Sequence, residues 1–501
     1  MRADPVSPQP WQDPAAAGPQ TAAGAPSGQR HAPVAAPAGS PASPRHVGRV
    51  PEVVVDYRAA GELKRQVAER LRHELKLRDD LVGAAREQRG RALINEAVGL
   101  WADARAMERG VPVSPAEEVA LAEMVFALQF RAGRLQRYLD DDRIENILIN
   151  GHDQVWLDFA DAERVRAEPV ADSEEDLKEL LRDLARHSGQ SERTLSTADP
   201  FLALRLADGS RLQAMTGVTG ERTYVTIRRH RLRGTDLAGL VQLGTLDARL
   251  QQFLAAAVRA ERNIMVAGEQ AAGKTFLLRA LLREIHPDER FGTIETEFEL
   301  WAHENGFHRQ VVPMEARESN GERVDGKAAG EITLLDLLNR ALRMTLTRVV
   351  VGEVRGPEIT ALMQALTSGR GGNLATLHAI APHVVFDRIA ELYLQARGNF
   401  SEKLAYRQIA NGLHLLVYVS MDDRTHVGGR RQRWVSHVWE ITGLGPDGRP
   451  SYNELFGPAP DGSLRAVPRT PPSPKTLQRL ERAGFPAHLL HEGAWTTEVA
   501  R

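Results

Sequence analysis

The stretch "GEQAAGKT", residues 268–275, constrains the fold of this chain more than any other feature. It fits the pattern G-x-x-x-x-G-K-[ST], which is typical of loops that bind phosphate, through Gly268, Gly273, Lys274 and Thr275. The apolar run "RNIMVAG" leads into the loop, and "KTFLLRALLREI" continues it with helical periodicity. Because free backbone N–H groups at the start of a helix attract anions, this order of strand, loop and helix predicts a phosphate site.

Two alanines set this loop apart, because the β-carbons of Ala271 and Ala272 restrict positive φ where glycine would not. Both residues keep their backbone donors, so the expected penalty is conformational. In a working loop, Lys274 would reach the β and γ phosphates of ATP, and the Thr275 hydroxyl would bind Mg²⁺. The alternative is a glycine turn that carries an incidental lysine, but the flanking strand and helix favour the phosphate site.

The length of 501 residues exceeds what a single hydrophobic core usually serves, so several domains are expected. The first 50 residues are rich in Pro and Ala and nearly free of large apolar side chains, which predicts a disordered tail. Apolar spacing from Leu63 predicts helices, and one of them begins at "SPAEE", with Ser114 as N-cap and Glu117 as capping-box carboxylate. Further along, alternating apolar strands and amphipathic helices predict an α/β fold with a mostly parallel sheet.

Composition and charge exclude several classes of function. The net charge of -2 and the pI of about 6.8 provide no basic field, so direct DNA binding is not expected. The chain has no cysteine, which excludes disulfides, thiolate metal sites and cysteine nucleophiles. No apolar run approaches the roughly 18 residues of a spanning helix, and the N-terminal segment lacks a signal-peptide core. We therefore expect any membrane association to come through a partner.

A second candidate element, which contains an acidic residue, follows the phosphate loop in "RVVVGEVRG", residues 348–356. The apolar run predicts a buried strand, and Glu353 at its end would lie at the edge of the sheet where ligands usually bind. There a carboxylate can face Mg²⁺ and the attacking water of a phosphoryl-transfer reaction. The alternative is a salt bridge between Glu353 and Arg355 at the end of the strand.

Three further residues are weaker candidates when each is taken alone. Glu295 and Glu299 lie in "TIETEFEL" near the end of an apolar stretch, and His378 follows a predicted strand in "NLATLHAI". Charged residues usually occupy solvated faces, and a lone histidine is more often a surface or satisfied core residue than a catalyst. Their order and spacing after the phosphate loop are what make these three residues candidates for the site.

The most diagnostic sequence words are "LNRALRM", "VVVGEVRGPEITALMQALTSGRGGNLATLHA", "LADGSRLQAM" and "VTIRRH". Together with the phosphate loop they resemble the secretion ATPases that drive type II secretion, type IV pili and type IV secretion. The helical N-terminal segment is similar to the branch that serves tight-adherence pili. The resemblance covers roughly residues 60–490.

This resemblance implies roles for the matching residues. Lys274 and Thr275 match the family's phosphate loop, and Glu353 matches the acidic Walker B residue that activates water. Glu295 with Glu299 matches its acidic box.

Three cationic or titratable residues match further family elements. His378 matches the histidine box that senses the γ phosphate. Arg211 in "DGSR" and Arg228 in "TIRR" match arginines that reach the nucleotide phosphates when two domains close. For each arginine the alternative is a surface residue on a strand.

Two departures from the family pattern suggest slow hydrolysis. The family usually has Glu-Asp in its acidic box, whereas Thr296 follows Glu295 here. Its phosphate loop usually reads Gly-Ser-Gly-Lys-Thr-Thr, whereas this loop has Ala271, Ala272 and, after Thr275, Phe276.

The resemblance implies a RecA-like P-loop NTPase domain preceded by a mixed α/β (PAS-like) domain and an N-terminal helical bundle. The expected regions are a disordered Pro/Ala-rich tail at 1–50, a helical bundle at 51–140, an α/β domain closing over nucleotide at 141–235, a RecA-like ATPase domain at 236–450 and a C-terminal extension at 451–501.

The activity implied by the resemblance is ATP hydrolysis by a Mg²⁺-dependent motor that powers pilus assembly or protein secretion. Such a motor would be a homo-oligomer, a hexamer, in the cytoplasm at the inner face of the cell membrane, where it acts on an integral-membrane platform protein. One alternative is a type IV secretion or conjugation ATPase. Another is an ATP-binding scaffold with little turnover.

Overall fold

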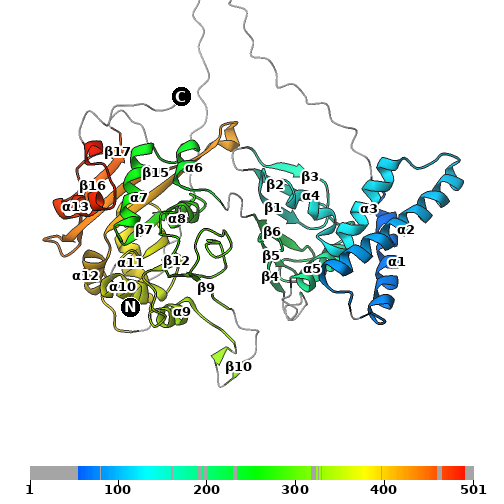
Figure 1. Cartoon of the computed structure of the whole chain (residues 1–501), viewed down its shortest axis with the longest axis horizontal. Coiled ribbons are helices and arrows are strands. Elements are labelled where there is room, and N and C mark those ends of the chain that lie inside the picture. Colours follow the sequence, from blue (N-terminus) through cyan, green and yellow to red (C-terminus); the bar gives the residue numbers. More distant parts are fainter. Residues whose placement is uncertain are drawn as a thin grey trace, which may run out of the picture. The chain divides into compact units, whose positions relative to one another are not determined.

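The computed structural model describes residues 55–490 apart from 79, 160–161, 189–194, 196–199, 230–233, 318–322, 325–326, 329, 370, 397 and 460–464. The predicted tail at 1–50 lies outside the described residues. Figure 1 colours the chain from its N-terminus to its C-terminus and labels its elements. In the described part of the chain, no helix combines the length and the hydropathy that crossing a bilayer requires.

Three helices open the described chain: α1 (Tyr57–Leu75), α2 (Gly83–Arg109) and α3 (Pro115–Phe130). They share one apolar cluster, in which Leu63, Val67 and Leu71 form the buried stripe of α1. The capping box predicted for α3 is confirmed, because Ser114 accepts from the backbone N–H of Glu117 and the Glu117 carboxylate accepts from that of Ser114. A short 3₁₀ turn, Gly133–Leu135, and α4 (Gln136–Leu139) lead to the first sheet.

The first sheet has six antiparallel strands in the order β3-β2-β1-β6-β5-β4. Their bounds are β1 Ile144–Asn150, β2 Val155–Phe159, β3 Val165–Ala167, β4 Phe201–Arg205, β5 Arg211–Met215 and β6 Tyr224–Arg228. Helix α5 (Glu174–His187) begins after the N-cap Ser173, whose side chain accepts from the backbone N–H of Asp176. The sheet matters for function because Arg211, at the start of β5, lies directly opposite Arg228, at the end of β6.

The second sheet has nine strands in the order β17-β16-β15-β14-β7-β13-β12-β8-β9. The strands from β14 to β9 in this order pair in parallel, and β14, β15, β16 and β17 pair antiparallel. The strand bounds are β7 Ile264–Gly268, β8 Phe291–Glu295, β9 Val311–Glu315, β12 Val349–Val354, β13 Leu374–His378, β14 Leu415–Asp423, β15 Arg431–Leu444, β16 Pro450–Pro458 and β17 Ala466–Pro468; the short pair β10 Arg323–Val324 and β11 Lys327–Ala328 lies apart.

Helices cover both faces of this sheet. They are α6 Leu237–Gln242, α7 Ala248–Arg259, α8 Lys274–Leu282, α9 Leu334–Ala341, α10 Glu358–Ser368, α11 Val385–Gln395, α12 Glu402–Gly412 and α13 Pro474–Arg482. In β7, Ile264 and Val266 pack with α6, α7 and α8, whereas Met265 and Ala267 pack with α9, α10, α11 and α12. Because side chains alternate along a strand, β7 must be apolar at every position, as the sequence predicted.

The parallel strands bring the candidate residues to one edge of the sheet. Gly268 ends β7, His378 ends β13 and Glu295 ends β8, and Glu353 is the second-last residue of β12. His378 is the direct partner of Gly268 in the ladder. The sheet continues past residue 450, because β16 pairs with β15 and β17 pairs with β16. Residue 450, the expected end of the ATPase domain, is thus the first residue of β16, a strand of the same sheet.

Candidate nucleotide site

The phosphate-loop pattern folds as strand, loop and helix. Gly268 ends β7, and a β-carbon at this position would lie 2.3 Å from the backbone oxygen of Val419 on β14. Gly273 is the N-cap of α8 with φ of 96°, in the left-handed region that favours glycine. Ala271 also has a positive φ, 62°, so the conformational penalty expected from the alanines falls on this residue.

Lys274 is the first residue of α8 and is only 6% exposed. Its Nζ donates to the backbone oxygen of Glu269 at 2.7 Å and lies 2.9 Å from Nδ1 of His378. Burial lowers the pKa of the Lys274 ammonium to about 8, although the Glu353 carboxylate acts in the opposite direction. The lysine is therefore held across its own loop, with its charge directed at the edge of the sheet.

His378 connects Lys274 with Glu353. Its Nε2 lies 2.5 Å from Oε1 of Glu353. An ammonium can only donate, so Nδ1 of His378 accepts from Lys274. In the neutral imidazole this leaves the ring proton on Nε2, the nitrogen that faces Glu353. These contacts define one tautomer of the imidazole and one orientation of the carboxylate.

Glu353 also contacts the guanidinium of Arg355, so the alternative interpretation of this pair as a strand-end salt bridge describes a real contact. Burial by itself would raise the pKa of the Glu353 carboxyl, but the hydrogen bonds from His378 and Arg355 outweigh it and hold that pKa at about 2. The carboxylate therefore remains ionised at neutral pH, with one oxygen on each partner.

A cavity of about 200 Å³ lies over the phosphate loop. Its lining includes Gly273, Lys274, Thr275, Glu353, His378, Glu299 and Arg228 from the predicted set, and also Glu145, Arg229, Gln270, Ala271, Phe276, Arg279, Arg355, Thr376 and Arg433. The structure thus brings most of the predicted residues together around one space.

Arg211 reaches this region through the acidic residues that follow β8. Its Nη1 donates to Oε1 of Glu299 at 2.6 Å, and its Nε contacts the carboxylate of Glu297. Burial acts to lower the pKa of the Arg211 guanidinium, but Glu297 and Glu299 outweigh it and leave that pKa above its usual value. Arg228 is exposed and lines the cavity directly. The two arginines therefore have different surroundings, although they are neighbours in the sheet.

Glu295 does not line the cavity. It is 2% exposed, and its Oε2 accepts from the backbone N–H groups of Glu299 and Leu300 at 2.7 and 2.8 Å. Burial raises the pKa of the Glu295 carboxyl to about 7 despite these two hydrogen bonds. Its contacts shape the loop that presents Glu299, so only the second carboxylate of the predicted pair faces the cavity.

Two arginines that line the cavity, Arg433 of β15 and Arg279 of α8, were not predicted from the sequence. Nε of Arg433 donates to the backbone oxygen of Ala271 at 2.9 Å, and Nη2 donates to Oε1 of Glu145 at 3.0 Å. Nε of Arg279 donates to the backbone oxygen of Glu299 at 2.5 Å. The only sequence signal for Arg433 is its alternation with Arg431, which predicts that both lie on one face of a strand.

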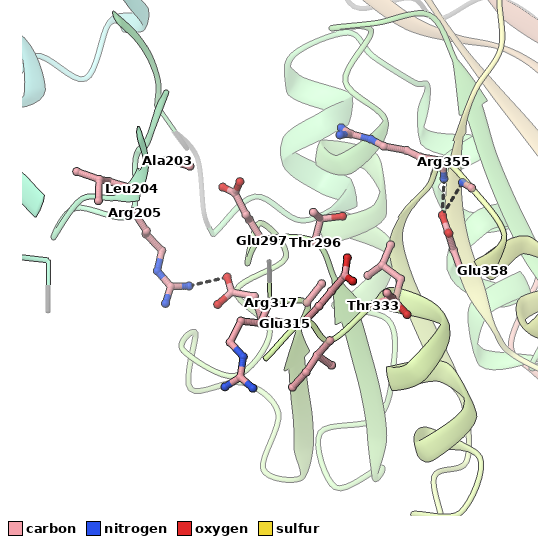
Figure 2. Close-up of a pocket in the computed structure, with 15 residues that line it drawn as sticks. Ala203, Leu204, Arg205, Thr296, Glu297, Glu315, Arg317, Thr333, Arg355 and Glu358 are labelled. Carbon is pink, nitrogen blue, oxygen red and sulfur yellow. Dashed lines mark hydrogen bonds and ion pairs between the residues drawn. The ribbon is translucent and has the colours of Figure 1, made fainter. Parts of the chain in front are cut away.

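A second cavity, of about 600 Å³, adjoins the first and shares Arg355 with it. Figure 2 shows its main contacts: Nη1 of Arg205 lies 3.1 Å from Oε1 of Glu315, and the Glu358 carboxylate faces the backbone of Arg355 and Gly356. Oε1 of Glu358 accepts from these two N–H groups at 2.6 and 2.8 Å. This carboxylate therefore fixes the backbone from which the Arg355 side chain reaches Glu353.

The donors at the nucleotide site suit a hard cation held together with phosphate. The described residues contain no cluster of three or more His, Cys, Asp or Glu side chains that could hold a metal ion. Mg²⁺ commonly binds through one or two protein oxygens plus substrate phosphates, and the cavity lining offers the Thr275 hydroxyl and the Glu353 carboxylate.

Comparisons with known proteins identify the family. The sequence profile described as Type II/IV secretion system protein matches residues 132–420, a shorter span than the expected 60–490. A putative conjugal transfer protein of Mycobacterium tuberculosis is 33% identical over 298 residues, which are 58% of this chain and 80% of the relative. The type IV secretion system protein VirB11 of Brucella suis is 30% identical over 345 residues, 64% of this chain and 92% of the relative.

Among solved structures, the VirB11 ATPase from the Brucella suis type IV secretion system, in complex with sulphate, is 27% identical with a TM-score of 0.32. That similarity covers 64% of this chain and 94% of that chain. The profile match spans more than half of the sequence, and both relatives are matched over most of their length. The profile match confirms the predicted relation to secretion systems: the chain belongs to the Type II/IV secretion system protein family.

Proposed function

We propose that this chain is an ATPase that hydrolyses ATP to ADP and phosphate and thereby drives pilus assembly or protein secretion. The observation that carries the proposal is the connected set Lys274, His378 and Glu353 over a phosphate loop. It joins a phosphate-binding cation to an ionised carboxylate through a histidine that contacts both. A glycine turn with an incidental lysine would not require these three residues to meet.

The charge of the cavity supports a polyphosphate ligand. Its lining residues include six cationic side chains (Arg228, Arg229, Lys274, Arg279, Arg355 and Arg433) and three carboxylates (Glu145, Glu299 and Glu353). Helix α8 adds free backbone N–H groups at its start. The volume of about 200 Å³ is smaller than an ordinary small-molecule pocket, so it suits the phosphates and leaves the adenosine outside.

Lys274 is the residue that we assign to the β and γ phosphates. Its present partners are a backbone oxygen and an imidazole nitrogen, and both are neutral acceptors. A phosphate oxygen carries negative charge and forms a stronger bond with the ammonium, so nucleotide would replace these partners. The released Nδ1 of His378 would then be free to respond to the γ phosphate. When bound, Mg²⁺ would neutralise charge on the transferred phosphoryl group, held by Thr275 and the phosphates.

Glu353 is the residue that we assign to the attacking water. With its pKa at about 2, the carboxylate is ionised at neutral pH. It would therefore accept a hydrogen bond from a water molecule and orient it, and it would not remove the water's proton early. His378 and Arg355 hold its two oxygens in place. Arg211 and Arg228 would offset negative charge that develops on the phosphoryl group, and Glu299 orients Arg211.

The finer assignment within the family rests on the resemblance. We place the chain in the tight-adherence branch, as a hexamer in the cytoplasm that acts on an integral-membrane platform protein at the inner face of the membrane. Closure of the α/β domain over the ATPase domain would transmit hydrolysis to that partner.

A second candidate is a type IV secretion or conjugation ATPase. It is favoured by the names of two relatives, a putative conjugal transfer protein and VirB11 of a type IV secretion system. A third candidate is an ATP-binding scaffold with little turnover, which the strained Ala271 and the residue Thr296 in the acidic box favour.

Steady-state phosphate release from the purified full-length chain with ATP and Mg²⁺ tests the proposal, with Glu353→Gln as the control for contaminating ATPases. We expect turnover that disappears in the control. ATP binding without turnover, including after addition of the platform protein, would support the scaffold instead. If neither binding nor turnover occurs, the nucleotide site itself is wrong.

A further inference from the structure

Arg433 bonds to the one phosphate-loop residue that is conformationally strained. Ala271 has φ of 62°, a left-handed conformation that the β-carbon of alanine disfavours. Its backbone oxygen accepts a hydrogen bond of 2.9 Å from Nε of Arg433. A charged donor forms a stronger hydrogen bond than a neutral one, so this contact stabilises Ala271 in its strained conformation.

The guanidinium of Arg433 is itself held from its other side. Nη2 donates to Oε1 of Glu145 at 3.0 Å, and Glu145 also accepts from Nη1 of Arg431 at 3.1 Å. Nε of Arg431 donates to Asp423 at 2.7 Å. The Arg433 side chain is 22% exposed, so the solvent screens these contacts only in part.

We infer that Arg433 is a positioning residue that holds the alanine-bearing phosphate loop in its phosphate-binding shape, and that Glu145 of β1 holds Arg433 in turn. In a loop with glycine at position 271 the left-handed conformation is readily adopted, and no such brace is needed. With alanine, the loop keeps this shape because a bond from β15 opposes its tendency to leave it. The backbone N–H groups at the start of α8, which would face phosphate, depend on that shape.

This brace links the shape of the loop to the first sheet. Glu145 lies near the start of β1, in the same sheet as Arg211 and Arg228, whereas Ala271 and Arg433 belong to the nine-stranded part of the chain. Movement of Glu145 away from Arg433 would weaken the bond to Ala271. Affinity for nucleotide would then fall as the two parts separate, which favours release of product from the open form.

The inference rests on the proposed function in one respect, because ATP must bind at this loop. The test is an equilibrium titration of the full-length chain with a fluorescent ATP analogue and Mg²⁺, with unlabelled ATP as competitor. The variants are Arg433→Gln, Ala271→Gly and the double variant, and Arg431→Gln is the matched control. Arg431 shares Glu145 with Arg433 but bonds to Asp423 and not to the loop.

We expect Arg433→Gln to weaken ATP binding about tenfold, the loss typical of one charge-assisted hydrogen bond. Arg431→Gln should change the dissociation constant less than about twofold. The deciding measurement is the rescue. In the Ala271→Gly background, Arg433→Gln should also raise the dissociation constant for ATP by less than about twofold, because glycine needs no brace. In the native background, Arg433→Gln should raise KM more than it lowers kcat.

Three results would overturn the inference. Equal ATP affinity of native chain and Arg433→Gln would mean that the loop needs no brace. If Arg433→Gln lost as much ATP affinity in the Ala271→Gly background as in the native one, Arg433 would act on the nucleotide directly or support the fold. An equal loss in Arg431→Gln would mean that the charge around Glu145 matters and the bond to Ala271 does not. Absence of ATP binding to the native chain would instead refute the proposed function, and the inference with it.

Discussion

Oε1 of Glu353 on β12 lies 2.5 Å from Nε2 of His378 on β13, so two adjacent parallel strands deliver an acid and a histidine to the same point. The other ring nitrogen of His378 lies 2.9 Å from Nζ of Lys274. Replacing His378 by Phe removes both contacts. We expect turnover to fall at least about tenfold while ATP affinity changes less, because the histidine orients Glu353 and only borders the phosphate site. Equal loss of affinity and turnover would contradict this role.

Lys274 and Glu353 are expected to do different work. Lys274→Ala should weaken ATP binding and turnover together, because it removes the cation assigned to the phosphates. Glu353→Gln should bind ATP but lose turnover by at least about 100-fold, because an amide neither orients water as a carboxylate does nor accepts its proton. Isothermal titration and phosphate release separate the two effects. Native turnover in Glu353→Gln would remove this residue from the mechanism.

Substitution of Arg211 should destabilise the protein more than substitution of Arg228, whereas both substitutions should lower turnover. Arg211→Gln leaves the carboxylates of Glu297 and Glu299 without their guanidinium, so unfolding should become easier by about 1–3 kcal/mol. Arg228→Gln changes an exposed residue and should alter stability by less than about 0.5 kcal/mol. Both changes should lower turnover, by up to about 10³-fold. Thermal unfolding and phosphate release together check this, and full activity of both variants would refute the assignment.

Glu295 should make stability depend on pH. Its carboxyl has a folded-state pKa of about 7 against 4.5 in the unfolded chain, so the folded protein binds the proton more tightly. The stabilisation from this group is fully present below pH 4.5 and is lost as pH rises through about 7, a loss on the order of 3 kcal/mol.

The variant Glu295→Gln keeps an oxygen that can accept from the N–H groups of Glu299 and Leu300 but does not titrate. We compare the Tm of this variant with that of the native chain at the same pH. The difference, variant minus native, should be more positive at pH 8 than at pH 5. Parallel Tm curves for the two proteins across this range would show that the carboxyl does not titrate there.

Gly268 should tolerate no side chain. A β-carbon there would lie 2.3 Å from the backbone oxygen of Val419, and neither β7 nor β14 can move without breaking the sheet. Gly268→Ala should destabilise the chain by about 3 kcal/mol or more. The matched control is Gly61→Ala in α1, where no atom lies within 4 Å of the new β-carbon. This control should be stabilised by about 0.5–1 kcal/mol. Equal Tm values for the two variants would contradict the steric argument.

Local patterns in the sequence were sufficient for much of the fold. The helix start at Ser114 and the apolar strand before Gly268 depend on residues a few positions apart, which is why hydrogen-bonding chemistry and periodicity predict them. The pattern around Glu353 likewise predicted a carboxylate at the edge of a parallel sheet, because such strands end together.

Other features depended on residues that are distant in the chain. Burial of Glu295 beneath its loop follows from the packing of β8 beside β12, and a β-carbon on Gly352 of β12 would lie 3.1 Å from its Cγ. Arg433 and Ala271 are separated by 162 positions, and their bond exists only because the nine-stranded sheet places β15 beside β14 and β14 beside β7.

The sequence by itself therefore determined the phosphate loop, the acidic strand end and the family, since these are encoded by contiguous residues whose spacing has a local physical cause. Only the tertiary structure decided which carboxylate faces the cavity, which tautomer His378 adopts and which arginine supports the strained Ala271. Those outcomes depend on burial and on side-chain partners from different strands, and no local pattern specifies which distant partner a side chain will meet.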